Sequence, residues 1–267
     1  MTAPAAVSID EARELSELRA YLGDGYDHGR LEAWEEQLDR EFERIGDEEA
    51  FYRRSDGYLY NLTAFAVSKT KLPYLRDLTA LVGPGSRLLD YGCGIGSDGL
   101  ALAEAGYTVA FADFDNPSTR YLRWRLERRG ISAEVYDLDT HPPSPGFDLA
   151  FAFDVIEHVP DPPATLAEME RLADIVLVNL LEPEPGETPL HHPLDVPALL
   201  ARAAAGGPLH YRRYWERSHL VAWGTWPAAN WRRARARARL ALGRRRATAG
   251  GAGGAGGVGG VGAANAG

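Results

Sequence analysis

The sequence predicts an α/β fold, with a seven-stranded, mostly parallel sheet, helices on both of its faces and an N-terminal helical cap. Two observations lead to this prediction. From Ser86 onward, short apolar runs alternate with helical segments, which is the pattern of a parallel sheet covered on both faces. Before Ser86, apolar residues recur at spacings of three and four, which is typical of amphipathic helices.

Five strands are expected at 86–90, 108–113, 132–136, 148–153 and 174–181. Two more, at 209–215 and 219–226, are joined by a tight turn and form an antiparallel pair. Asn116-Pro117 and Asp161-Pro162 are good N-cap and first-turn pairs for two of the intervening helices. The α/β domain therefore spans 86–226.

The regions on either side of this domain differ from it. Residues 1–85 read as the helical cap, which begins at the capping pattern Ser8-Ile9-Asp10-Glu11 and includes a helix that ends near Gly46. Residues 227–267 are Arg-rich and then Gly/Ala-rich, and we expect this tail to be disordered. Its arginines could bind an anionic partner or the acidic part of the protein itself through their charge. The plainer interpretation is a solvated terminus.

Composition limits the functional classes. The chain has 267 residues, one cysteine and a net charge of −9, and the eight arginines after residue 230 leave 21 basic against 38 acidic residues in 1–230. The net negative charge of residues 1–230 disfavours a nucleic-acid substrate. With a single cysteine, no signal peptide and no apolar run long enough to span a membrane, we expect a cytoplasmic protein without membrane contact.

The chemistry centres on the run Leu88-Leu89-Asp90-Tyr91-Gly92-Cys93-Gly94-Ile95-Gly96. An apolar strand ends on an acid and opens into three glycines, which let a backbone turn approach a ligand closely. The glycines of 94–99 also satisfy the G-x-G-x-x-G pattern of nicotinamide enzymes. In that fold, however, the first glycine follows the strand at once, and an intervening Asp90 would repel a pyrophosphate but attract a cationic ligand.

Asp90-x-Gly92-Cys93-Gly94-x-Gly96 closely resembles motif I of the class I S-adenosylmethionine-dependent methyltransferases. The resemblance covers about 86–226 and implies a Rossmann-like sheet, an antiparallel strand pair at its end and S-adenosylmethionine as cofactor. It also implies that Asp90 and the residues of the glycine turn, Gly92, Cys93, Gly94 and Gly96, contact that cofactor.

Acids follow two further strands and are assigned to the same ligand. Asp113 ends the second strand, where a carboxylate can accept hydrogen bonds from the two ribose hydroxyls, with Asp115 as the alternative. By resemblance, Phe114 lies along the adenine ring and Asp137 accepts from its amino group, although Asp139 is close enough to compete. Each acid has a plainer interpretation as a loop or capping residue.

The segment 147–161 resembles the family's fourth strand and the loop beyond it. Asp154 would border the cofactor, while His158 and Glu157 are the catalytic candidates because a histidine there can accept a hydroxyl proton. An equally good interpretation is that Glu157 and His158 only stabilise the loop. The Asp-x-x-Glu-His spacing also resembles the Glu-x-x-Glu-His element of magnesium-dependent quinone-biosynthesis and small-RNA ribose O-methyltransferases, with a further ligand available from His191-His192.

The sequence is therefore interpreted as a methyltransferase that acts on a small-molecule acceptor, at oxygen or nitrogen. Three alternatives stay open: a magnesium-assisted ribose or quinone O-methyltransferase, a nicotinamide-dependent oxidoreductase and a non-catalytic cofactor- or partner-binding module. The acceptor, any metal and the oligomeric state are not predicted. The expected acceptor pocket is lined by residues of the cap and of the later loops: Tyr58, Tyr60, Asn61, His191, His192 and Trp215.

Overall fold

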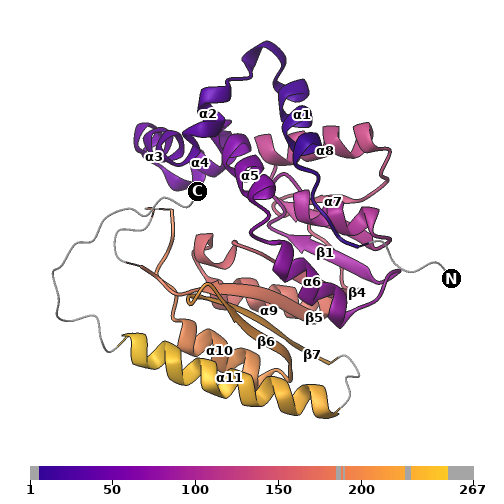
Figure 1. Ribbon diagram of the computed structural model, residues 1–267, viewed down its shortest axis with the longest axis vertical. Helices are drawn as coiled ribbons and strands as arrows, with labels where there is room; N and C mark the ends of the chain where they lie inside the picture. Colours follow the sequence, from indigo (N-terminus) through magenta and orange to yellow (C-terminus); the bar gives the residue numbers. More distant parts are fainter. Residues whose placement is uncertain (1–5, 185–187, 189, 226–229, 252–267) are drawn as a thin grey trace.

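A computed structural model describes residues 6–184, 188, 190–225 and 230–251 (Figure 1). Its centre is a seven-stranded sheet with the order β3-β2-β1-β4-β5-β7-β6, in which β7 runs antiparallel to both of its neighbours and the remaining pairs are parallel. The sheet confirms the predicted fold class. Its strands are β1 (Arg87–Tyr91), β2 (Thr108–Asp113), β3 (Val135–Asp137), β4 (Phe147–Ala152), β5 (Ala173–Leu181), β6 (Pro208–Tyr214) and β7 (Ser218–Gly224).

Successive residues of the strands point to opposite faces, and each face has its own apolar core. Leu88 and Phe111 pack under α6 (Leu72–Leu81), α7 (Ser97–Glu104) and α8 (Pro117–Arg129). Their neighbours Leu89 and Ala110 belong to the other core, with α9 (Pro162–Leu172), α10 (Val196–Ala205) and part of α11 (Asn230–Gly251). The helices therefore cover both faces, as the near-continuous apolar strands predict.

The chain before the sheet is helical, and Figure 1 shows most of these helices gathered at one end of the sheet. Asp10 caps the first helix by accepting from the Arg13 backbone N–H, two residues beyond the expected Ser8. The predicted second helix is interrupted at Ala33 and ends, as expected, at Gly46 with φ 67°. The elements are α1 (Glu11–Leu22), η1 (Gly23–Gly25), α2 (His28–Glu32), α3 (Trp34–Ile45), α4 (Glu48–Arg54) and α5 (Gly57–Ser68).

A buried ionic network joins α1 to α8. Glu14 and Glu17 of α1 are each paired with Arg125 and Arg129, and the Arg125 side chain is fully buried. Arg125 Nη1 also donates to the carbonyl of Ile95, at 2.8 Å, within the glycine turn. The cap is thus attached directly to the loop that the sequence assigns to the cofactor.

The predicted disorder of 227–267 is wrong for Asn230–Gly251, which form α11. Ala236 and Leu240 are buried, and Leu240 joins the core that contains Tyr211 of β6. In Figure 1 this helix, in yellow, lies beside α10. Residues 252–267, which carry the rest of that prediction, lie outside the described residues. No helix in the described part of the chain is long and apolar enough to cross a membrane.

Candidate active site

The glycine turn after β1 has the backbone that its sequence predicts. Gly92, Gly94 and Gly96 have φ values of 71°, 52° and 71°, a region that residues with a Cβ rarely adopt. A Cβ at Gly92 would lie 2.7 Å from Val155, and one at Gly94 would lie 2.8 Å from Leu62. These glycines are therefore required both by the turn and by the loop and helix packed on it.

Asp90 and Asp113 both brace this turn. The Asp90 carboxylate is buried and accepts from the Gly99 N–H at 3.1 Å, so it holds the start of α7. The two Asp113 oxygens accept from the Gly94 and Phe114 N–H groups, at 2.8 and 2.7 Å. Burial raises the pKa of both acids. Because each carboxylate oxygen has two lone pairs, Asp113 keeps acceptor capacity for a further donor.

Cys93 lies in the same turn, and its backbone N–H donates to the carbonyl of Ala112 at 3.2 Å. Burial raises the pKa of its thiol well above the usual value, and the charges of Asp113 and Asp90 act in the same direction. The side chain is therefore a neutral thiol.

A second part of the site lies where β2 and β3 end. Phe114 is 40% exposed, and the Arg53 guanidinium from α4 lies over its ring, 5.2 Å from the centroid. Arg53 also pairs with Asp139 at 2.8 Å. Asp137 accepts from the Thr140 hydroxyl and from the Asp139 N–H, and these hydrogen bonds lower its pKa. A side chain of the cap thus packs on Phe114, one of the residues predicted to contact adenine.

At the end of β4, Asp154 has φ 54°, which is uncommon for a residue other than glycine. Asn179 of β5 holds this conformation, because its side chain accepts from the Asp154 N–H at 2.8 Å and donates to Asp154 Oδ1 at 2.7 Å. Backbone strain of this kind persists only where the surroundings impose it, and it is frequent at functional sites.

Lys71, a residue that the sequence analysis did not single out, lies among the acids of these loops. Its Nζ is 3.4 Å from Asp154 and 3.8 Å from Asp98, and it donates to the carbonyl of Phe153 at 3.0 Å. Burial alone would lower the pKa of Lys71, but Asp154, Asp98 and Asp90 more than offset it and raise the pKa. Burial raises the pKa of Asp98 to about 6, although Lys71 opposes that shift.

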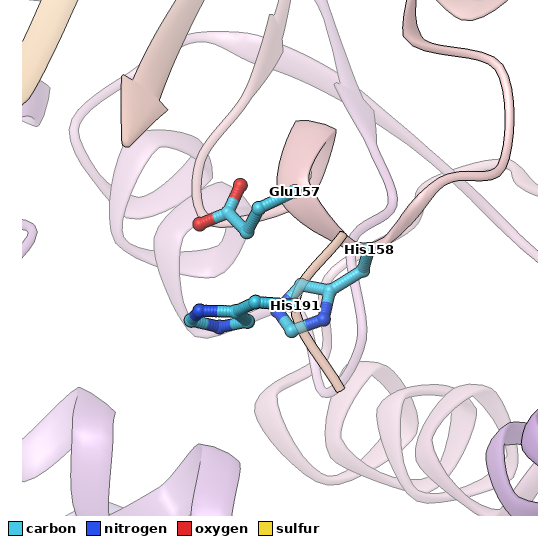
Figure 2. A group of neighbouring side chains, drawn as sticks. All are labelled: Glu157, His158 and His191. Carbon is cyan, nitrogen blue, oxygen red and sulfur yellow. The ribbon is translucent and has the colours of Figure 1, made fainter. Parts of the chain in front are cut away.

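Glu157, His158 and His191 form a cluster beside these acids, with one potential ligand atom of each within 4.8 Å of the others (Figure 2). Glu157 and His158 come from η2 (Ile156–His158), and the His192 N–H fixes the later segment by donating to the Glu157 carbonyl at 2.7 Å. The imidazole rings of His158 and His191 meet edge to face at 4.6 Å. Residues 33 positions apart thus share one site.

The hydrogen bonds of His158 determine its protonation. Nδ1 lies 2.9 Å from the Leu190 carbonyl and 2.9 Å from the Tyr52 hydroxyl. Because a carbonyl can only accept, Nδ1 carries the proton and Nε2 keeps its lone pair. Burial, aided by the neighbouring His191, lowers the pKa of His158 to about 4. This imidazole is neutral at physiological pH.

The expected pocket-lining residues have different environments. Tyr58 is close enough to Asp113, Glu157 and Asp154 that their charges, after burial, raise its pKa. Tyr60 is instead a core residue whose hydroxyl accepts from the Asp27 N–H, and Asn61 is also buried. His192 pairs with Glu48 at 3.1 Å. Trp215 is 51% exposed and packs against Tyr74 and Tyr214.

One feature of the sequence, the scarcity of lysine, could have identified Lys71. Lys69 and Lys71 are the chain's two lysines, against 27 arginines. Lys69 has φ 58° and ends α5, whereas Lys71 begins the turn that leads into α6 and reaches the acids. Tyr52 and Arg53 carried no comparable signal, because their partners are 106 and 86 residues away along the chain.

Comparison with known proteins matches residues 26–216 to a family model described as a methyltransferase domain. Ubiquinone biosynthesis O-methyltransferase from Xanthomonas campestris pv. campestris is 29% identical over 168 residues, 59% of this chain and 67% of that protein. The protein of the same name from Thiobacillus denitrificans is 36% identical over 95 residues, covering 33% and 40%.

Among solved structures, magnesium protoporphyrin IX methyltransferase from Synechocystis PCC 6803 with bound SAH is similar, with 14% identity, a TM-score of 0.47 and coverage of 79% of this chain and 94% of that one. The family model spans most of this chain, and the strand order and glycine turn agree with the predicted resemblance. The chain therefore belongs to the methyltransferase domain family, as a class I enzyme that uses S-adenosylmethionine.

Proposed function

We propose that this enzyme methylates a hydroxyl oxygen of a small molecule, bound between the helical cap and the carboxyl ends of β1 and β4. The observation that carries the proposal is the neutral imidazole of His158, which keeps a lone pair on Nε2 and belongs to a cluster of three side chains beside the cofactor acids. Its curated relatives are named O-methyltransferases, although the chain matches only two thirds or less of their length.

The residues around the glycine turn suit the two ends of the cofactor. Asp113 has lone pairs for the ribose hydroxyls, and Phe114 offers an exposed ring for adenine. Lys71 lies between Asp98 and Asp154. One cationic and two anionic side chains are therefore available to bind a zwitterionic amino-acid group, which carries both charges. In this assignment Lys71 binds the cofactor's carboxylate, and Asp98 and Asp154 bind its ammonium group. Asp90 acts through the turn that it braces.

The bound cofactor supplies an already activated methyl group, and the protein's work is to align the acceptor and exclude water. His158 Nε2 is the proton acceptor for the acceptor's hydroxyl, while the Leu190 carbonyl keeps Nδ1 protonated and the ring oriented. Tyr52 and Tyr58, whose rings meet edge to face at 5.5 Å, provide an aromatic wall from the cap. An aromatic hydroxyl compound is the acceptor class that fits such a wall.

A second candidate function is the metal-assisted form of the same reaction. It is favoured by the donor set of Glu157, His158 and His191, because two imidazoles and a carboxylate within 4.8 Å of one another suit a divalent transition metal. A metal held there would orient the acceptor's hydroxyl and lower its pKa. This donor set suits zinc or manganese better than magnesium, which prefers oxygen ligands.

The first experiment is calorimetric titration of the purified protein with S-adenosylmethionine, its demethylated product and NADH, followed by a screen of phenols and catechols as methyl acceptors. Binding of the first two with methylation at oxygen supports the proposal, whereas methylation at nitrogen or carbon contradicts it. Metal content is measured on the same sample, and activity is assayed after chelation and re-addition of zinc or manganese. Full activity without metal excludes the metal-assisted form.

A further inference from the structure

A groove on the side of the molecule formed by β6 and α11 contains an unusual concentration of positive charge. It has a volume of about 510 Å³, and its lining includes Tyr211, Arg212 and Arg213 of β6 and Arg235, Arg239 and Leu242 of α11. That volume is within the range of small-molecule binding sites. The lining contains four arginines and no acid, but the side chain of Arg212 points to the opposite face of β6, toward Asp77 of α6, so three guanidinium groups remain on the α11 side.

Two of these arginines have a carboxylate partner and two do not. Arg212 lies 3.5 Å from Asp77, and Arg213 donates to both oxygens of Glu182 at 3.0 Å. Arg235 and Arg239 form no ion pair or hydrogen bond within the described part of the chain, and both are exposed. Spaced by four residues, they lie on the same side of the helix and repel each other. A bound anion relieves this repulsion.

The packing of α11 fixes these two guanidinium groups over β6. Ala236 and Leu240, which directly follow Arg235 and Arg239 in the sequence, are buried, and Leu240 packs in the core on this face of the sheet. Gly243 passes directly over the Tyr211 ring, where a Cβ would collide with the phenol. Arg237, by contrast, is an exposed residue of the same helix that does not line the groove. The groove is therefore a feature of the packed fold.

We propose that this groove binds a small phosphate-bearing ligand, of the diphosphate class, as a site separate from the methyl-transfer site. The planar guanidinium donates two parallel hydrogen bonds to a phosphate, and several of them together suit a compact, multiply charged group. A polynucleotide fits less well, because residues 1–230 carry 38 acidic against 21 basic residues and would repel a long polyanion that extended beyond the groove.

The test is a calorimetric titration of the full-length protein with inorganic pyrophosphate, at low and at physiological ionic strength. The variants are R235Q/R239Q on α11 and R213Q on β6, with R237Q as the matched control on the same helix. We expect pyrophosphate affinity to fall by roughly tenfold or more in R235Q/R239Q, because charge-assisted hydrogen bonds are lost, and by less in R213Q, because Arg213 already pairs with Glu182. Circular dichroism and thermal melting show that each variant is folded.

Affinity in R237Q is expected to stay within about twofold of the parent, because general electrostatic attraction alone is small for one exposed charge. No pyrophosphate binding by the parent, or equal losses in R237Q and R235Q/R239Q, overturns the proposal. A single-stranded oligonucleotide that binds more tightly than pyrophosphate through Arg235 and Arg239 also overturns it, in favour of a nucleic-acid surface.

Discussion

His158 is the residue whose surroundings say most about its chemistry. Because burial lowers its pKa to about 4, the imidazole is neutral above that pH and loses its free lone pair only below it. An essential neutral His158 therefore predicts a kcat that is maintained from pH 8 down to about pH 5. A kcat profile with an acid limb near pH 6.5 contradicts this assignment.

Replacing His158 with Asn tests the same role directly. The Asn amide can still donate to the Leu190 carbonyl, but it has no group in the place of Nε2. We expect kcat to fall roughly 10²- to 10⁴-fold, the usual contribution of general base catalysis, with unchanged affinity for S-adenosylmethionine. His28→Ala, at a histidine whose side chain is 67% exposed, is the control. Retention of full activity by the Asn variant rules out His158 as the base.

Asp98 predicts a second pH effect, on cofactor binding. Burial raises its pKa to about 6, so the carboxylate is neutral below that pH and charged above it. Since the charged form attracts an ammonium group, the affinity for S-adenosylmethionine is expected to rise between pH 5 and 7, with a midpoint near 6. Calorimetry over this pH range checks it. The Asp98→Asn variant should bind more weakly and without the pH dependence.

At the scale of single residues, local sequence predicted the turn but not its partners. Gly92, Gly94 and Gly96 were predictable because the positive φ of each is a local requirement. Lys71 was not, since the acids around it come from α7 and from the loop after β4, more than 25 residues away. The strained backbone of Asp154 depends on Asn179, whose side chain no pattern relates to it.

The element α8 is attached to α1 through the buried network of Glu14, Glu17, Arg125 and Arg129. Burial alone would raise the pKa of Glu17, but the hydrogen bonds and charges of Arg129 and Arg125 lower it, so this acid is ionised at neutral pH. Arg125→Met removes one charge from the network and leaves an acidic excess buried.

We expect the Arg125→Met change to lower the free energy of unfolding by about 3–5 kcal/mol, the usual cost of breaking a buried ion pair. Arg120→Met, on the same helix but half-exposed in a 3.5 Å pair with Asp115, should change it by less than about 0.5 kcal/mol. Urea unfolding of the two variants measures the difference. Equal losses would mean that the network adds nothing beyond a surface pair.

Among the elements, α11 shows where compositional reasoning fails. Arginine at nearly every second position of 231–247 gives no coherent apolar face, and the tail 227–267 as a whole was predicted to be disordered. The helix needs few apolar contacts, because Ala236, Leu240 and the small Gly243 let its backbone lie close to Tyr211. Contact through small residues leaves little trace in a hydrophobicity pattern.

For the molecule as a whole, the α/β sandwich was predictable from the alternation of apolar runs and helices, and strand bounds were close to those observed. The shortest strand was the least accurate: β3 is Val135–Asp137, where 132–136 was expected. The register of this edge strand, in which Val135 lies opposite Phe111 and Asp137 opposite Asp113, depends on pairing with β2, which sequence periodicity does not report. The arrangement of the cap over the site was likewise not predictable, because it depends on contacts between distant segments.

Cofactor binding should stabilise this whole assembly. At a concentration 100 times Kd, S-adenosylmethionine is expected to add about 2.7 kcal/mol of stability and to raise Tm by several degrees. NADH should give no shift. Asp113→Ala should abolish most of the Tm increase at the same ligand concentration, because it removes the ribose acceptor and the brace of Gly94. A full increase in that variant would contradict the role of Asp113.

The position of Arg53 has a consequence for the order of events in turnover. Its guanidinium lies over Phe114 and is held there by Asp139, so a side chain of the cap lies over part of the end of the site proposed for adenine. With adenine beside Phe114, exchange of the cofactor requires this ion pair to separate. With adenine bound there as proposed, we expect an ordered kinetic scheme, in which the cofactor enters first, the acceptor follows, and the demethylated cofactor is the last product to leave.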